Sequence, residues 1–155
     1  MYKRDKKVLK KLKKILPSYF NTLPISKTNV SQAILSNKNN LKKIIKIIHL
    51  EIRKKMNFFL KKNKKKKFVI LDIPLLLENK IYNKNDILIF VQSRKSDILK
   101  KLKKRKNFNK KLMKKFSKIQ LPLDYKKKKS QFVIKNDFKR RTVLRYIRNI
   151  LKEIN

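Results

Sequence analysis

Three short, continuous apolar runs constrain the fold of this chain more than any other feature. They are FVILDI at 68–73, DILIFVQ at 86–92 and QFVIKN at 131–136, and each is rich in β-branched and aromatic residues. An unbroken run of this kind is typical of a strand that is covered on both faces, because neither set of alternating side chains meets water. The three runs therefore predict a parallel β-sheet.

The segments around these runs have apolar residues at helical spacing instead. An apolar stripe recurs every three to four residues in five segments, which are 5–16, 28–36, 41–62, 96–105 and 138–154. The first three segments predict a helical block ahead of the sheet. The last two alternate with the predicted strands, which favours an α/β layered fold.

The length and the apolar content predict one folded domain over residues 1–155. Hydrophobic residues make up 41% of the chain, which is too much for a disordered polycation. Within this domain we expect a helical block at 5–62 and an α/β part at 68–155. A chain of 155 residues is long enough to bury a sizeable core.

The charge of the chain is extreme, at 48 Lys and Arg against 9 Asp and Glu, or +39. Only eight of these cations are Arg, whereas proteins that read phosphates and bases favour the planar, bidentate guanidinium. Lys, Asn, Ile and Phe, which are abundant here, have AT-rich codons, so compositional drift explains much of the charge. Drift predicts sequence-indifferent polyanion binding at low salt that is lost as salt rises. A basic nucleic-acid-binding protein is the alternative reading.

Several classes of protein are disfavoured by what the sequence lacks. Without cysteine there is no disulfide framework and no thiolate metal site, and we expect no metal-binding residues. No apolar run approaches the length of a membrane span, and the first residues have no apolar core of an export signal. A cytoplasmic location without membrane association is therefore expected.

Two carboxylates lie near the end of the first apolar run, one within it and one beyond it. Asp72 ends the run, and open parallel sheets place their ligand crevice at the carboxyl ends of strands. Pro74 then turns the chain, and Glu78 follows. Asp72 therefore has two readings, a binding or catalytic position and a cap of the turn.

Two basic or titratable residues on the predicted helices are weaker candidates. His49 is the only histidine, and a single His beside an apolar stripe is more often a packed residue than a catalyst. Arg105 ends the helix predicted at 96–105, where a solvated cation is favoured by the helix dipole.

Taken together, several elements resemble the dephospho-coenzyme A kinases in their order and spacing over residues 25–153. The elements are IIHLEIRKKM (47–56), DIPLLLE (72–78), DILIFV (86–91), a helix ending in Arg105, QLPLDYK (120–126) and FVIKN (132–136). One departure is Leu50, where the family usually has Pro. The acidic, proline-containing element at 72–78 is the most specific of the six.

The resemblance implies a P-loop kinase-like, three-layer fold with a parallel sheet, a helical substrate-binding block and a lid at about 106–125. It implies transfer of the γ-phosphate of ATP, with Mg²⁺, to the ribose 3′-hydroxyl of dephospho-coenzyme A, the last step of coenzyme A biosynthesis. ATP and dephospho-coenzyme A would be the partners. The proposed binding residues by resemblance are Asp72, Glu78, His49 and Arg53 for the acceptor, Arg105 and Asn136 for ATP, and Gln120 and Pro122 for the return of the lid.

The chain also departs from the family, because its 155 residues contain no glycine. A P-loop needs small residues so that backbone N–H groups can wrap the phosphates, together with a Lys and a hydroxyl. These residues alone are therefore expected to be inactive, without the first strands of the fold or the family's early Asp. We expect the preceding roughly 30 to 40 codons to encode a strand, a G-x-x-x-x-G-K-[ST] loop and a second strand that ends in Asp. A non-catalytic remnant is the further alternative.

Overall fold

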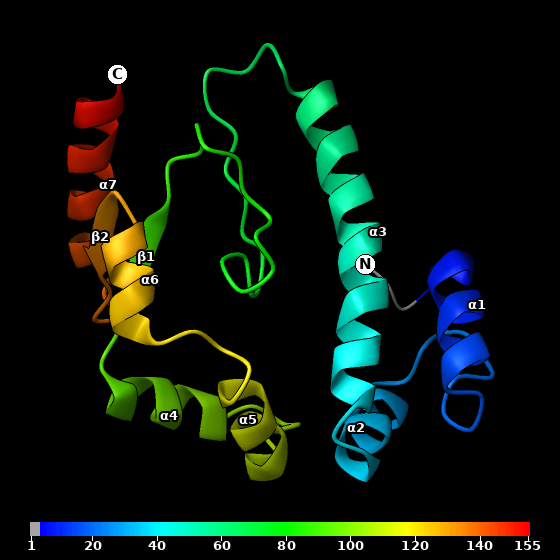
Figure 1. The fold of residues 1–155 in the computed structure, drawn as a ribbon. Coiled ribbons are helices and arrows are strands. Elements are labelled where there is room, and N and C mark those ends of the chain that lie inside the picture. The colour runs from blue at the N-terminus through cyan, green and yellow to red at the C-terminus, as the bar shows by residue number, and fades with distance from the viewer. Residues whose placement is uncertain (1–3) are drawn as a thin grey trace. The chain divides into compact units, whose positions relative to one another are not determined.

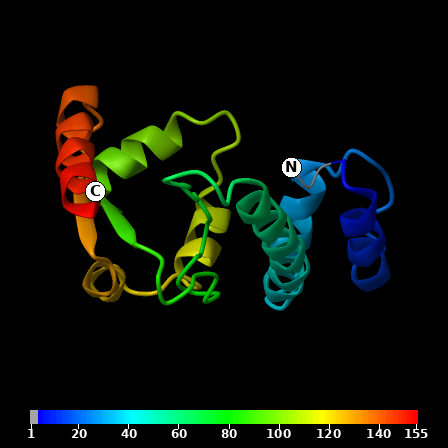
Figure 2. The same ribbon diagram turned by 90° about the horizontal axis from the view of Figure 1, so that it is seen from above.

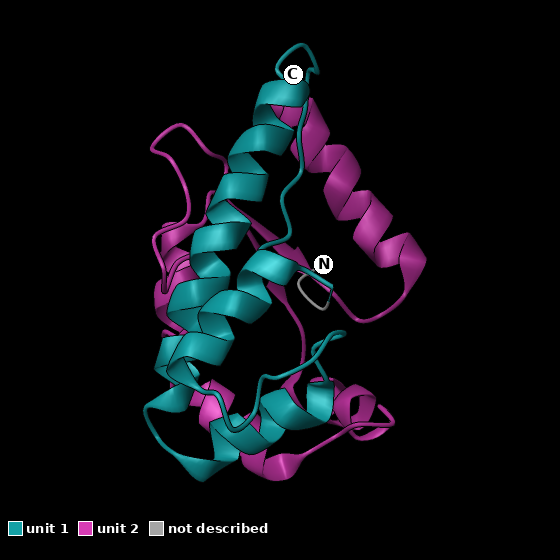
Figure 3. Ribbon diagram, turned by 90° about the vertical axis from the view of Figure 1, so that its right-hand side faces the viewer, with its two compact units in different colours: residues 1–73 teal, residues 74–155 magenta. Residues whose placement is uncertain are grey.

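The computed structural model describes residues 4–155, and its contacts divide the chain into two compact units. Unit 1 comprises residues 1–73 and unit 2 comprises residues 74–155 (Figure 3). The boundary falls inside the DIPLLLE element. Whether the two units act as the single domain expected from the sequence stays a prediction, and each unit is described by itself.

Over its described residues, 4–73, unit 1 has three helices. They are α1 (Lys6–Ile15), α2 (Lys27–Ser36) and α3 (Asn40–Lys62), and both α1 and α2 pack on α3 (Figures 1 and 2). All three agree with the apolar spacing of the sequence to within a residue or two. The helical prediction for this part of the chain is confirmed.

The core of unit 1 is made by the apolar stripes of these helices and by the loop between α1 and α2. Its buried apolar residues are Val8, Leu12, Leu16, Phe20, Ile25, Ala33, Ile34, Leu41 and Ile44. Ala33, the only alanine of the chain, is fully buried and its carbonyl accepts a 2.9 Å hydrogen bond from Nδ2 of Asn40. This bond satisfies a buried amide and ties α2 to the start of α3.

Unit 2 contains a small parallel sheet and four helices. In chain order its elements are β1 (Ile89–Gln92), α4 (Lys95–Lys103), α5 (Lys110–Ser117), α6 (Leu123–Lys129), β2 (Phe132–Lys135) and α7 (Arg140–Ile154). The strands pair in parallel from Ile89 opposite Phe132 to Gln92 opposite Lys135, and α7 packs on β2. The segment expected to form a lid, 106–125, contains α5 and the beginning of α6.

The sheet is smaller and more exposed than the sequence predicts. Residues 68–73 form neither helix nor strand, so the prediction of a strand there is wrong, and Ile70 is 90% exposed. In β1, Ile89 and Val91 are 44% and 56% exposed, so the prediction that both faces are covered is also wrong for this strand. A parallel strand needs neighbours for its backbone hydrogen bonds and layers for its faces, and within residues 4–155 the sheet has only two strands.

A tight turn shapes the part of the DIPLLLE element that lies in unit 2. Leu75 and Lys80 have positive φ angles of 57° and 50°, a conformation that is costly for residues with a Cβ. The turn is closed by hydrogen bonds from the amide of Asn79 to the carbonyl of Leu75 and from the amide of Ile81 to that of Leu76. Buried Ile81 anchors its end, which fixes the position of Glu78.

Within residues 4–155, no helix combines the length and the apolar character that crossing a membrane requires.

Candidate functional site

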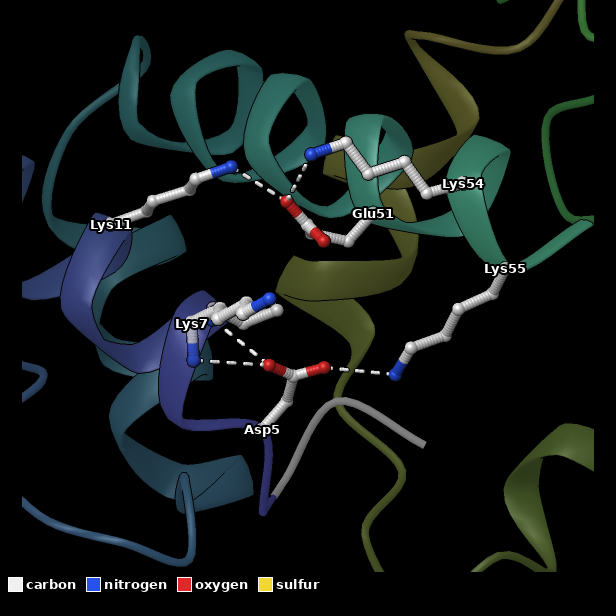
Figure 4. Close-up of polar contacts among 7 residues, drawn as sticks. Asp5, Lys7, Lys11, Glu51, Lys54 and Lys55 are labelled. Atoms are coloured by element: carbon white, nitrogen blue, oxygen red, sulfur yellow. Dashed lines mark hydrogen bonds and ion pairs between the residues drawn. The ribbon is translucent and has the colours of Figure 1, made fainter. Parts of the chain in front are cut away.

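The first polar cluster of the structure begins with Asp5, at the start of α1. One carboxylate oxygen of Asp5 accepts hydrogen bonds from the amides of Lys7 at 3.1 Å and Val8 at 3.2 Å, which is the geometry of an N-cap. The other oxygen lies 2.8 Å from Nζ of Lys55 on α3 (Figure 4). Asp5 therefore both caps α1 and attaches its first turn to α3.

Glu51, on the face of α3 that packs against α1, is the second carboxylate of this cluster. The residue is only 9% exposed, and its Oε1 lies 2.6 Å from Nζ of Lys11 and 3.7 Å from Nζ of Lys54 (Figure 4). A carboxylate with so little access to water is stable only when cations and donors satisfy it. Lys11 on α1 is thus the principal partner of a buried charge on α3.

The lysines keep both carboxylates ionised. The hydrogen bond from Lys55, followed by that from the amide of Val8, lowers the pKa of Asp5 below its ordinary value. The hydrogen bond from Lys11 likewise lowers the pKa of Glu51, against a smaller opposing effect of burial. Both groups therefore act as anionic acceptors at neutral pH.

The two carboxylates lie at a hollow of about 490 Å³ in unit 1. The hollow is lined by Asp5, Lys6, Lys7, Glu51, Lys54, Lys55 and Phe58. Ammonium groups attract phosphate, a carboxylate accepts a hydrogen bond from a hydroxyl, and the exposed ring of Phe58 offers an apolar wall. The hollow can therefore receive a ligand that carries both phosphate and hydroxyl groups.

Sequence reasoning missed this cluster. In the sequence Asp5 is only the first residue of a predicted helix, and Glu51 lies within 47–56 with no role assigned to it. The signal that could have found them is the scarcity of acid, because a chain with nine carboxylates among 48 cations has few that drift alone would retain. Two of those nine lie at one hollow.

Glu78 is the centre of a second polar cluster, in unit 2. Its Oε1 lies 2.6 Å from Nζ of Lys126 on α6 and accepts a 3.0 Å hydrogen bond from the amide of Leu121. Burial raises the pKa of Glu78, but the hydrogen bonds from Lys126 and from backbone amides outweigh it, so that the pKa is lowered overall. These contacts join DIPLLLE to QLPLDYK, through residues such as Glu78 and Leu121 that are 43 positions apart in the chain.

Asn136 lies just past β2. Its backbone amide donates a 2.7 Å hydrogen bond to the carbonyl of Gln92, which extends the pairing of the two strands. Its side-chain oxygen accepts a 2.8 Å hydrogen bond from the amide of Phe138, so it also shapes the turn into α7. The structure thus brings FVIKN and DILIFV together at the carboxyl ends of their strands, where parallel sheets bind ligands.

The remaining predicted site residues lie in different surroundings. His49 and Arg53 are one turn apart on α3, with the Nδ1 atom of His49 buried and Arg53 exposed. Asp72 is exposed, in the irregular segment before the turn. Arg105 is exposed beyond the end of α4, where its amide donates to the carbonyl of Leu102. Their roles in binding stay predictions.

Gln120 and Pro122, which the resemblance predicts to hold the return of a lid, flank the contact with Glu78. Gln120 ends the turn after α5, and Pro122 precedes the first residue of α6. Among residues 4–155, no group of three or more His, Cys, Asp or Glu side chains is arranged to hold a metal ion.

Comparison with known proteins places these features in one family. The sequence profile of the family described as "Dephospho-CoA kinase" matches residues 3–141. The dephospho-CoA kinase of Wolbachia pipientis wMel is 29% identical over all of this chain and 80% of its own length, and that of the Wolbachia endosymbiont of Brugia malayi is 27% identical over the same shares. That of Fusobacterium nucleatum is 32% identical over 73% of this chain and 58% of its own length. The chain belongs to the dephospho-CoA kinase family.

Proposed function

We propose that this chain supplies the acceptor-binding and lid parts of an enzyme that phosphorylates the ribose 3′-hydroxyl of dephospho-coenzyme A with ATP. The observation that carries the proposal is the family match over residues 3–141, which includes all six elements on which the sequence resemblance rests. Contacts in unit 2 support it, because they join DIPLLLE to QLPLDYK and DILIFV to FVIKN. The proposed location is the cytoplasm.

In this proposal the hollow of unit 1 binds the acceptor. Lys7, Lys54 and Lys55 line it and would hold phosphate groups of dephospho-coenzyme A, while His49 and Arg53 contribute from the same helix, α3. Asp72 and Glu78 keep the acceptor-binding role that the family resemblance implies. Lysine is suited to this role as a compact point charge on a flexible stem.

The base that accepts the proton of the attacking hydroxyl would be the family's early Asp, which the preceding segment is expected to supply. Asp5 lies at the hollow in its ionised form, with its oxygens held by Lys55 and by the amides of Lys7 and Val8, and would orient Lys55 toward the phosphates of the acceptor. Glu51 would hold Lys54 in the same way, although it is nearly buried and pairs mainly with Lys11.

ATP would contact Arg105 from the lid and Asn136 from the carboxyl end of β2. The phosphates also need a P-loop, which these 155 residues cannot form without glycine, so the P-loop kinase-like, three-layer fold requires strands and a loop from outside them. Mg²⁺ would arrive with the nucleotide phosphates and neutralise the charge that develops on them, and no residue described above is assigned to it. Phosphoryl transfer depends on positioning and electrostatics, so these 155 residues alone, without a P-loop, should not catalyse the reaction.

A two-part assay tests the proposal. The 155-residue chain is compared with a fusion that places before it a donor segment made of a strand, a G-x-x-x-x-G-K-[ST] loop, a helix and a second strand ending in Asp. Each is given ATP, Mg²⁺ and dephospho-coenzyme A. We expect a product heavier by one phosphate only from the fusion. Turnover by the 155 residues alone would contradict the need for a P-loop. A folded fusion that binds neither substrate would contradict the assignment of the acceptor site.

The role of Asp5 has its own variant. Asp5→Asn preserves an N-cap, because Asn caps helices about as well as Asp, but it removes the charge that holds Lys55. In the fusion we expect the KM for dephospho-coenzyme A to rise by a factor of about 3 to 10, with a small loss of thermal stability. Asp97→Asn, in the first turn of α4, is the matched control and should leave this KM unchanged.

A further inference from the structure

Helix α7 differs from the rest of the chain in the kind of cation that it has. Arg140, Arg141, Arg145 and Arg148 are half of the eight arginines of the chain, and Lys152 is the only lysine within the helix. Everywhere else lysine dominates, as the AT-rich composition predicts. Drift toward lysine therefore does not account for α7.

Four of these cations form a row on one face of the helix. Arg141, Arg145, Arg148 and Lys152 are spaced by four, three and four residues, which places them one above the other along about 16 Å of helix. All four side chains are exposed. The helix uses another face to pack on β2, with Ile150 buried.

No carboxylate neutralises this row in the described part of the chain. None of the ion pairs found within residues 4–155 includes an arginine of α7. The carboxylate of Asp137 is occupied by the amide of Lys139 and the hydroxyl of Thr142. Glu153 lies on a different face of the helix. The guanidinium groups thus present their donors to solvent.

We propose that this arginine row, defined as Arg141, Arg145, Arg148 and Lys152, binds the phosphate backbone of a nucleic acid. Guanidinium groups bind phosphate oxygens in pairs, and a straight row of them matches a polymer with regularly repeated phosphates better than a single small anion. An anionic membrane fits less well, because an interfacial helix must insert a broad apolar face, whereas α7 packs on β2 with Ile150 buried and leaves Leu144, Ile147 and Leu151 no more than 39% exposed. The proposed kinase function assigns no role to this row, so the inference goes beyond that function.

The test must separate this row from the general charge of the chain. A triple variant with Arg141→Gln, Arg145→Gln and Arg148→Gln is compared with one that has Lys64→Gln, Lys65→Gln and Lys66→Gln. The control loses the same charge from an exposed lysine run after α3. Binding of a short labelled DNA duplex is measured by fluorescence anisotropy over a salt series, after circular dichroism has shown that both variants retain their helices.

We expect the arginine variant to bind at least about ten-fold more weakly at low salt, and the slope of log affinity against log salt to fall by about three. The lysine control should change both values far less. A third variant with the three arginines replaced by lysine should lose part of the affinity and keep most of the slope. Equal losses in the glutamine variant and its control would overturn the proposal. Binding of the glutamine variant to phosphatidylserine vesicles is measured as well. If this variant lost vesicle binding while its duplex binding was unchanged, the proposal would be overturned and the row would be assigned to a membrane surface.

Discussion

Unit 1 and unit 2 differ in how well they bury their apolar side chains. Of the twelve buried apolar residues described, nine lie in unit 1 and only Ile81, Ile134 and Ile150 lie in unit 2. The large exposed apolar side chains are distributed the other way. Unit 1 has Leu50, Phe58, Phe59, Phe68 and Ile70, and unit 2 has Ile87, Ile89, Val91, Ile98, Leu99, Phe116, Leu123, Tyr125, Phe138, Leu144, Ile147 and Leu151.

The difference follows from what each kind of element needs. A helix satisfies its own backbone, and three amphipathic helices can bury their stripes against one another. A parallel strand needs a neighbour at each edge and a layer on each face. The two strands of unit 2 have one neighbour each, and only β2 has a helix packed on it. Unit 1 is therefore expected to be the more stable half of the chain.

Hydrogen exchange should show the largest consequence of this difference. Amides at the centre of α1 and α3 are expected to exchange about 100-fold or more slowly than those that pair β1 with β2, because local opening of a half-covered sheet exposes little additional apolar surface. Mass spectrometry of peptides from each unit measures this. Similar protection in the two units would show that the sheet is covered in solution, and would contradict the expectation that unit 1 is the more stable half.

A pair of truncations sharpens the comparison at single side chains. Leu12→Ala removes a fully buried side chain of unit 1 and should cost about 3 to 4 kcal/mol of local unfolding free energy. Val91→Ala removes an exposed one from β1 and should cost less than about 1 kcal/mol. Both are read from the exchange of amides in the same unit. A large cost for Val91→Ala would indicate that something covers β1 in solution.

The sequence predicted these two halves unequally well. Every helix of unit 1 could be located from its own apolar spacing, because that signal is local. The run at 68–73 has the composition of a buried strand, but composition cannot show whether a neighbouring strand is present, and here the run pairs with none. For the candidate sites, Glu78 was identified from its motif, whereas its partner Lys126 was one lysine among 40. Asp5 and Glu51 were missed because only the packing of α1 on α3 brings them to one hollow.

Glu78 offers a polar contact on which unit 2 depends. Glu78→Gln keeps the shape of the side chain but removes the charge that Lys126 and the amide of Leu121 contact. It should lower the free energy of local unfolding of α6, measured from the hydrogen exchange of its amides, by about 2 kcal/mol. The control is Asp124→Asn, an exposed change in the first turn of the same helix. An equal, small effect of both variants would mean that the joining of DIPLLLE to QLPLDYK contributes little to the stability of unit 2.

The smallest expected effect is a pH dependence of the contact between α1 and α3. Asp5 and Glu51 have pKa values in the folded chain below their ordinary values of 3.8 and 4.5, so the folded state favours their ionised forms. Their ion pairs therefore stabilise unit 1 fully above about pH 5, and this stabilisation is lost as the pH falls through 4.5 and 3.8 toward the lowered pKa values.

Exchange of α1 amides, corrected for the intrinsic rate at each pH, measures this loss. In the double variant Asp5→Asn with Glu51→Gln, unit 1 should be less stable at neutral pH, and its stability should change less as the pH falls into the acid range. Added salt should weaken the effect of Asp5, whose partner Lys55 is more exposed, more than that of Glu51. An unchanged acid dependence in the double variant would show that other carboxylates control the stability of unit 1, and that the two charges at the hollow are available for ligand binding with little role in packing.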